Sequence, residues 1–311
     1  MKKLKFVVSL TNDDNDYQVE QAAAAEDAAK RLGVDLELIH ADNDSIEQSQ
    51  QLLQRIQSGS VAHPDAILFE PVGTALPQVA RAAAVAGIGW GVLNREVNYL
   101  AELRKASQAP AFCVTSNHEE IGRIQGRQIG LLLPQGGTVL YIQGPAENSA
   151  AKERTAGMYE VKPVAVQVKQ MRAQWTEASA YKVVHSWLRL STSQSASFDM
   201  VAAQDDSMAM GARKAFHEVL DTDTRERWLR LPLLGCDGLP GSGQTWVRQG
   251  LLTATIYVPP NAGQAIEMMA KAIQGGAMPA EITLTTAVSY PALDKLAQND
   301  SGSKTFSAFS G

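Results

Sequence analysis

The stretch that decides the fold is Gly144–Met158, GPAENSAAKERTAGM. It follows a short apolar run, Thr138–Gln143, that is typical of a strand. Gly-Pro indicates a turn, Asn148 and Ser149 are good N-cap residues, and the run rich in Ala, Lys, Glu and Arg favours a helix. We therefore expect Arg154 in the first turns of a helix that begins at the carboxyl end of a strand. Open α/β sheets bind their ligands at that edge.

Arg154 has two interpretations at this stage. Its guanidinium offers five donors in a rigid fork, which suits hydroxyl groups or a carboxylate of a ligand. Alternatively, it is a solvated helix charge paired with Glu153 or Glu147, and such surface pairs contribute little. On spacing alone, the solvated helix charge is the favoured interpretation.

The composition is that of a globular protein large enough for two domains. The chain has 311 residues, is 45% hydrophobic and 20% charged, and carries a net charge of -5. Because no basic block is present, we do not expect nucleic acid or a membrane surface to be the partner. No apolar run approaches the roughly 18 residues that a membrane-spanning helix needs.

The first residues, MKKLKFVVSLTNDD, begin like a secretion signal. The apolar run Leu4–Leu10 contains Lys5, however, and no small-residue cleavage site precedes the acidic cluster. We interpret Leu4–Leu10 as the first strand of the fold. The expectation is that an export signal is missing from this chain, or that the protein is cytosolic.

The two cysteines, Cys113 and Cys236, lie in apolar runs in different halves of the chain. Buried free thiols are common in such runs, and a disulfide between the two stays open as the less favoured alternative. Neither cysteine has a CxxC or Cys/His neighbour, so we expect no metal site here.

Strands alternate with helices along the whole chain, which predicts right-handed crossovers and mostly parallel, doubly wound sheets. The strands expected in the first half are Leu4–Leu10, Val34–His40, Ala66–Phe69, Gly89–Leu93 and Ala111–Thr115. Those expected in the second half are Thr138–Gln143, Val164–Val168, Met200–Ala203, Leu231–Cys236 and Leu252–Tyr257. A helix over Asn261–Ile273 is expected to return to the first half, and a strand over Ile282–Thr286 and a frayed tail from Gln298 follow it.

Polar and aromatic residues gather where these strands end. The set contains arginines, carboxylates, amides and aromatic rings: Asn15, Tyr17, Asn94, Arg95, Arg154, Trp175, Asp205, Asp206 and Asp237. Planar polar groups can each bind two hydroxyls, and aromatic faces stack on the C–H face of a sugar ring. The set therefore favours a polyhydroxylated ligand.

Each of these residues also has a purely structural interpretation. Asp237-Gly238 is a common turn dipeptide, and one of Asp205 and Asp206 is expected to be a helix N-cap, with Asp206 the better placed. Packing explains the aromatic rings equally well, and a solvated loop explains the remaining polar pair: Trp175, Tyr17, Asn94 and Arg95.

Catalytic interpretations have little support. The histidines are scattered without metal-ligand spacing, and no nucleophile elbow, phosphate-binding loop or dinucleotide fingerprint occurs. Paired carboxylates at Asp205, Asp206 and Asp237 are a remote acid/base alternative. We expect no enzyme activity, no cofactor and no metal.

The quoted stretch resembles the segment of ribose-type periplasmic sugar-binding proteins in which a strand is followed by a small-residue loop and an arginine. The segments VLNREV, AQDDSMAMGARKAF, LLGCDGLPGSG and GLLTATI resemble further parts of that family, from Phe6 to about Tyr290. The family includes the solute-binding proteins of ABC transporters and the effector domains of LacI-type repressors. Of these motifs, AQxDxMAxGAxxA and GxDG, in this order and spacing, are the more specific.

The resemblance implies two Rossmann-like domains joined by a three-crossover hinge, the type I periplasmic binding protein fold. The first lobe would comprise residues 1–116 plus 259–285, and the second 117–258 plus 286–311.

The same resemblance implies ligand-binding positions. Asn15 and Tyr17 match the first-loop amide and aromatic of the family, and Asn94 and Arg95 match its Asp-Arg pair. The family's arginine, aromatic, Asn and Asp positions are matched, in this order, by Arg154, Trp175, Asp205 and Asp237.

Three positions depart from the family pattern. Asn94 replaces an Asp, Asp205 replaces an Asn, and Val258 takes a place that is usually Gln. We therefore expect a ligand other than ribose. The segment after Gly157 is short for the family, so the helix that begins near Ser149 is expected to be clipped.

Together, the residues and the resemblance predict a monomeric solute-binding protein. It would capture a monosaccharide or related polyol by hinge closure, in the periplasm or another extracytoplasmic space, and present it to an ABC permease in the membrane. The alternative is a ligand-sensing module of the same fold that signals to a sensor kinase or acts as a LacI-type effector domain. Because no helix-turn-helix precedes Leu4, the repressor version is less favoured.

Overall fold

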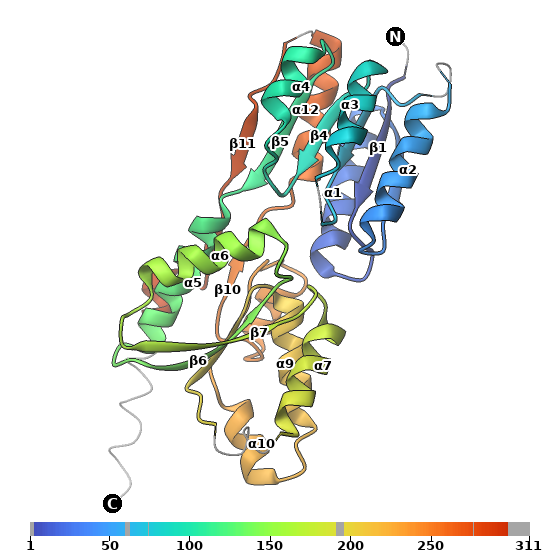
Figure 1. The fold of residues 1–311 in the computed structure, drawn as a ribbon. Helices are drawn as coiled ribbons and strands as arrows, with labels where there is room; N and C mark the ends of the chain where they lie inside the picture. The colour runs from blue at the N-terminus through green and yellow to red at the C-terminus, as the bar shows by residue number, and fades with distance from the viewer. Residues whose placement is uncertain (1–2, 60–62, 74, 191–195, 276, 298–311) are drawn as a thin grey trace, which may run out of the picture. The chain divides into compact units, whose positions relative to one another are not determined.

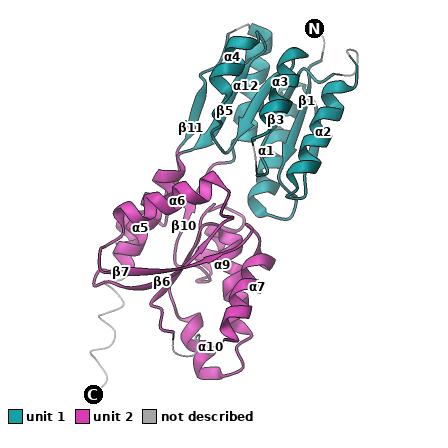
Figure 2. Cartoon of the chain, in the orientation of Figure 1, with its two compact units in different colours: residues 1–116, 260–285 teal, residues 117–259, 286–311 magenta. Residues whose placement is uncertain are grey.

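The computed structural model describes residues 3–59, 63–73, 75–190, 196–275 and 277–297. The chain forms two compact units: Met1–Ser116 with Pro260–Thr285 (unit 1), and Asn117–Pro259 with Thr286–Gly311 (unit 2) (Figure 2). The chain therefore passes from one unit to the other three times. The tail predicted from Gln298 lies outside the described residues.

Unit 1 is built on a six-stranded parallel sheet with the strand order β11-β5-β4-β3-β1-β2. The strands are β1 (Lys5–Leu10), β2 (Asp35–His40), β3 (Ala66–Phe69), β4 (Gly89–Leu93), β5 (Ala111–Ser116) and β11 (Ile282–Thr285). β11 comes from the returning segment and forms the edge beside β5 (Figure 1).

Helices cover both faces of this sheet. The continuous apolar run of β1 sends Phe6, Val8 and Leu10 into one core, and Val7 into the other. The first core is completed by α1 (Asp16–Leu32) and α12 (Ala262–Gly275), and the second by α2 (Ser45–Gln57), α3 (Pro77–Val85) and α4 (Leu100–Ala106). Unit 1 is thus doubly wound.

Unit 2 has a four-stranded parallel sheet with the order β7-β6-β8-β9, and a separate antiparallel pair, β10-β12. The strands are β6 (Gly137–Gln143), β7 (Val166–Arg172), β8 (Met200–Ala203), β9 (Leu233–Leu234), β10 (Thr255–Tyr257) and β12 (Val288–Tyr290). The helices are α5 (His118–Leu132), α6 (Ser149–Val161), α7 (Glu177–Leu188), α9 (Asp206–His217), α10 (Thr222–Leu229) and α11 (Gly243–Arg248). α5 and α6 contribute to one core of the unit, and α7, α9 and α10 to the other.

Two glycines let α5 and α6 approach closely. A Cβ atom at Gly122 of α5 would collide with the backbone oxygen of Arg154, and one at Gly157 of α6 would collide with that of Glu119. The position of α6, and of Arg154 on it, therefore depends on backbone contact with α5.

The predicted fold class, α/β with parallel sheets, is confirmed. Three short elements were missed: α4, α10 and β12. α4 and α10 lie in polar segments that pack through only one or two buried side chains, Leu100 and Leu103 in α4 and Trp228 in α10. β12 has three residues, and each of them is half-buried or exposed.

Some predicted bounds were also wrong. The helix that begins at Ser149, α6, runs for 13 residues and ends two residues before Pro163. The strand predicted over Val164–Val168 runs instead from Val166 to Arg172, and the last residues of this strand are largely exposed. β9 contains only Leu233 and Leu234.

Both cysteines are buried free thiols, so the alternative of a disulfide is not realised. Within the described residues, every helix is too short or too polar to cross a bilayer.

Candidate functional site

Three neighbouring strands of unit 1 end beside a group of buried polar side chains. β1 pairs with β3 and β3 with β4, all in parallel, so their carboxyl ends lie at one edge. Glu70 follows β3, and its side chain bridges two others. Its Oε1 accepts a hydrogen bond from Asn94 Nδ2 at 3.1 Å, and its Oε2 accepts one from Gln18 Nε2 at 3.0 Å.

Asn15 lies at this edge as the N-cap of α1. Its Oδ1 accepts a hydrogen bond from the Tyr17 backbone N–H at 2.8 Å, and its own N–H donates to Asn12 Oδ1 at 3.2 Å. Asn12 also donates to Asn43 Oδ1 at 3.1 Å, and Tyr17 is buried. The first loop is therefore held in one conformation by its amides.

Asn94 and Arg95 follow β4 on the same edge. Asn94 has a left-handed backbone with φ of 62°, which Asn tolerates better than most residues. Arg95 is buried, and its Nη1 donates to the Gly73 carbonyl at 3.4 Å. These positions exclude the interpretation of Asn94 and Arg95 as a solvated loop.

In unit 2, Arg154 is a buried, multiply bonded side chain at the carboxyl edge. It is only 5% exposed, so the alternative of a solvated helix charge is wrong. Its Nε donates to Nδ1 of His118 at 3.3 Å, its Nη1 donates to the Gln204 carbonyl, and Nη1 lies 3.9 Å from Asp237 Oδ1. The guanidinium is thus held in a fixed orientation.

Trp175 packs beside this arginine. The Arg154 guanidinium carbon lies 5.6 Å from the centre of the indole, within the range of a cation–π contact. A Cβ atom at Gly144 would collide with the indole, so the glycine that directly follows β6 provides the space for the ring. Trp175 therefore has a packing role, and part of its surface remains accessible.

The prediction that Asp206 is the N-cap of its helix is wrong, because α9 begins one residue earlier than expected. Asp205 is the cap and accepts from the Met208 N–H at 2.5 Å. The Asp206 carboxylate is buried instead, where it accepts hydrogen bonds from the Gly238 N–H at 2.7 Å and the Thr255 hydroxyl at 2.6 Å.

Asp237 is more than a turn residue. Its backbone N–H donates to Ile256 at 2.9 Å and its carbonyl accepts from Val258 at 2.9 Å, which makes a strand-like bridge beside β10. Its φ of 104° is unusual for a residue with a side chain. Val258, at the position where the family usually has Gln, is fully buried.

Backbone strain coincides with the predicted site. In the described residues, six side-chain-bearing residues have a positive φ, and three of them are Asn94, Trp175 and Asp237. Such conformations cost about 1–3 kcal/mol each and cluster at functional sites. Their coincidence with residues selected from sequence favours a functional role for the two edges.

Three polar residues at these edges were missed from the sequence: Glu70, His118 and Gln204. Glu70 and Gln204 directly follow β3 and β8, so the strand-end rule that selected Asn94 would have selected them too. The Gln204 amide joins the loop after β6 to α6, because its Oε1 accepts from the Gly144 N–H at 2.9 Å while its Nε2 donates to Ala151 O at 2.9 Å. Nothing local in the sequence indicates the contact of His118 with Arg154.

Metal and thiol chemistry find no support in this arrangement. No three His, Cys, Asp or Glu side chains of the described segments are grouped as a metal site. Burial raises the pKa of the Cys113 thiol to about 12 and also raises the pKa of Cys236, so both stay protonated at neutral pH.

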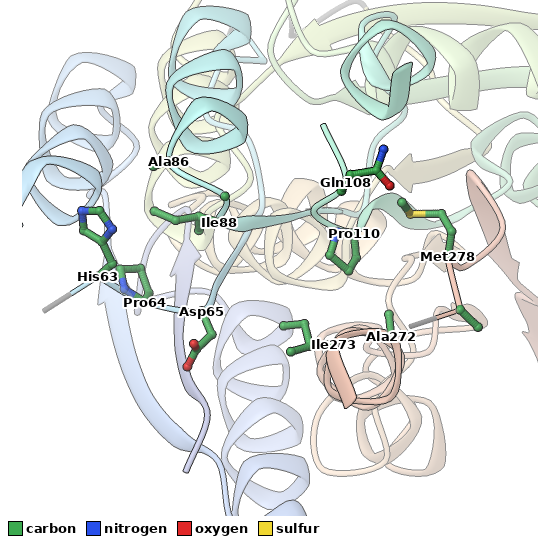
Figure 3. A pocket seen from close by; sticks show the side chains of 12 residues that line it. His63, Pro64, Asp65, Ala86, Ile88, Gln108, Pro110, Ala272, Ile273 and Met278 are labelled. Atoms are coloured by element: carbon green, nitrogen blue, oxygen red, sulfur yellow. The ribbon is translucent and has the colours of Figure 1, made fainter. Parts of the chain in front are cut away.

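A pocket of about 440 Å³ lies at the opposite, amino edge of the unit 1 sheet (Figure 3). Its lining includes Asp65, Ile88 and Pro110, which precede β3, β4 and β5, and Ile273 and Met278 near the end of α12. None of the predicted site residues lines it. Because parallel sheets bind ligands at their carboxyl edge, this pocket is not the candidate site.

Each unit has a parallel sheet with polar residues at its carboxyl edge, and the chain crosses between the units three times. These features are typical of two-lobed binding proteins. The chain belongs to the periplasmic binding protein domain family, whose model matches residues 6–277.

Named relatives agree with this family. The chain is 35% identical over 198 residues to a protein of Rhizobium meliloti named for rhizopine binding, a match that covers 61% of this chain and 60% of the relative, less than two-thirds of its length. It is 27% identical to the D-allose-binding periplasmic protein of Escherichia coli, with coverage of 82% and 79%. It is 25% identical to the ribose import binding protein of that species, with coverage of 88% and 85%.

Solved structures share the fold. A galactofuranose binding protein superposes with a TM-score of 0.79 and 21% identity, and covers 96% of this chain and 99% of its own. A fructose binding periplasmic domain of a hybrid two component system superposes with a TM-score of 0.75 and 20% identity. The match covers 97% of this chain and 96% of that domain. At these identities the likeness shows the fold alone.

Proposed function

We propose that the chain is a monomeric solute-binding protein that captures a monosaccharide or related polyol by hinge closure and delivers it to an ABC permease. In this proposal the carboxyl edge of unit 1 contributes Asn15, Tyr17, Asn94 and Arg95. The edge of unit 2 contributes Arg154, Trp175, Asp205 and Asp237. The protein works outside the cytoplasm, binds no nucleic acid and performs no turnover.

The observation that carries the proposal is the buried, fixed guanidinium of Arg154. It lies at the ligand edge of its sheet beside an indole and within ion-pair distance of Asp237. Because this guanidinium is already buried and oriented, it can bind hydroxyl oxygens with little further loss of conformational entropy. The neighbouring aromatic ring supplies a surface for the C–H face of a sugar.

Three chain crossings support the closure mechanism. In a two-lobed protein with such a hinge, a ligand that contacts both lobes stabilises the closed state and shifts the population toward it. Delivery to a permease is supported by relatives that are named import binding proteins.

The alternative function is ligand sensing. It is supported by the fructose binding domain of the same fold that belongs to a two component system. Gene deletion followed by uptake of the labelled ligand separates the two. Loss of uptake supports delivery to a permease, whereas normal uptake with lost transcriptional response to the ligand supports sensing.

A thermal-shift screen of the purified chain against sugars and polyols tests the binding function. A ligand present at 100 times its Kd should stabilise the folded state by about 2.7 kcal/mol. The proposal fails if a broad panel of pentoses, hexoses, furanoses and cyclitols, neutral and aminated, gives no shift.

A further inference from the structure

Glu70 is a buried carboxylate held by neutral partners. It is 7% exposed, and its two carboxylate oxygens accept hydrogen bonds from the side-chain amides of Gln18 and Asn94. A third amide, that of Gln48, holds the loop below it by donating to the Glu70 carbonyl at 2.9 Å and accepting from the Val72 N–H at 2.9 Å. Two side-chain amides therefore bind the carboxylate, and a third fixes the backbone of its loop.

No ion pair involves Glu70 in the part of the chain that the structure describes. The cation on the adjoining loop is Arg95, whose Nη1 donates to the Gly73 carbonyl. Amide donors stabilise a carboxylate by hydrogen bonding but do not cancel its charge.

The carboxylate also retains capacity for a ligand. Two carboxylate oxygens offer about four acceptor sites, of which two are used by Gln18 and Asn94. The amides on either side fix the orientation of the carboxylate, as expected for a preorganised binding group.

The location of Glu70 connects it to the proposed ligand. It follows β3, between β1 and β4, so it shares an edge with Asn15 and Asn94. At position 94 an amide replaces the carboxylate that the family pattern predicts, and that amide donates to Glu70. Within unit 1, a buried negative charge thus lies one strand away from position 94.

We infer that the ligand is a sugar or cyclitol that carries an ammonium group, and that this group binds the Glu70 carboxylate. This inference rests on the proposed function. An amino sugar or aminocyclitol is protonated near neutral pH and brings the missing positive charge to the edge, while its hydroxyls meet the amides and arginines.

Calorimetry with matched probes tests the inference on the full chain. The pairs are D-glucosamine with D-glucose, D-galactosamine with D-galactose, and amino-deoxy-inositols with the inositols. N-acetylated forms serve as controls, because they keep the nitrogen but lose the charge. On the skeleton that binds best, we expect the amino compound to bind at least tenfold more tightly than both its hydroxyl and its N-acetyl counterparts.

The variant Glu70→Gln removes the charge and keeps the size and an acceptor oxygen. It should weaken binding of the amino compound at least tenfold more than binding of the neutral counterpart. If Glu70 only orients Asn94 and Gln18, both compounds weaken equally, and the inference is overturned.

The wild-type comparison does not depend on the variant folding. Neutral sugars that bind as tightly as their amino counterparts overturn this inference but leave the proposed function intact. Failure of every probe, neutral and aminated, instead counts against the proposed function itself.

Discussion

At the scale of single residues, the unit 2 edge depends on the pairing of Arg154 with Asp237. Both are almost fully buried, and their charged atoms lie 3.9 Å apart. We predict that Arg154→Ala and Asp237→Ala each weaken ligand binding by at least about 2 kcal/mol, because each leaves buried polar partners unsatisfied. Isothermal calorimetry with the ligand from the screen measures the effect.

The matched control is Arg230→Ala. Arg230 also forms an ion pair, with Glu226, but its side chain is 78% exposed, so its removal should leave the affinity unchanged. Wild-type affinity in both the Arg154 and the Asp237 variants would refute the assignment of these residues to the site.

Trp175 provides an optical test of the site. We predict that Trp175→Phe removes most of the ligand-induced change in tryptophan fluorescence and lowers affinity less than about tenfold, because Phe keeps a flat ring for the sugar. Trp187→Phe is the control, since Trp187 packs against Phe198 and Trp228 within the unit 2 core. A full ligand-induced signal in Trp175→Phe would place the indole away from the ligand.

At the scale of elements, local chemistry was sufficient at helix ends where only one residue suits the cap. Asn148 caps α6 by accepting a hydrogen bond from the Ala151 N–H at 3.2 Å, as the sequence predicts. Gly33 ends α1 with φ of 68°, a conformation that favours glycine. The cap of α9 was misplaced because both Asp205 and Asp206 suit an N-cap. Only the tertiary contacts of Asp206 with Gly238 and Thr255 distinguish them.

The close contact of α5 and α6 gives a stability prediction. Gly122→Ala should destabilise the fold by about 1–3 kcal/mol and weaken ligand binding, because the new methyl collides with the backbone of Arg154 and pushes α6 away. Chemical denaturation and calorimetry measure the two effects.

Gly130→Ala, in the same helix, is the control. Its new methyl meets only the Pro163 ring, at 3.3 Å, and alanine has the better helix propensity. Equal stability of the Gly122 and Gly130 variants would show that α5 and α6 tolerate separation.

At the scale of the whole molecule, the returning segment completes unit 1. α12 supplies Ala262, Ala265, Ile266 and Met269 to the core that covers one face of the sheet, and β11 pairs with β5. We predict that residues 1–116 alone do not fold, because that face would be exposed to water. Circular dichroism and NMR dispersion report the outcome.

The control joins residues 1–116 to 260–285 through a Gly/Ser linker, and this chain should give a cooperative unfolding transition. Cooperative unfolding of 1–116 by itself would contradict the prediction.

The sequence by itself determined the fold class, the alternation of strands and helices, and the polar residues at strand ends. These follow from local apolar periodicity, turn residues and the rule that parallel strands end at one edge. The family pattern also identified Asn94 and Asp205 as departures from the usual site.

Only the tertiary structure decided which polar groups are buried and what they contact. It showed the Arg154–His118 contact, the inward carboxylate of Asp206 and the amide-held Glu70. These contacts join residues 32 to 52 positions apart, and no local pattern encodes them. Desolvation and hydrogen-bond geometry arise when separate strands come together, so they are properties of the assembled edge and not of any one segment.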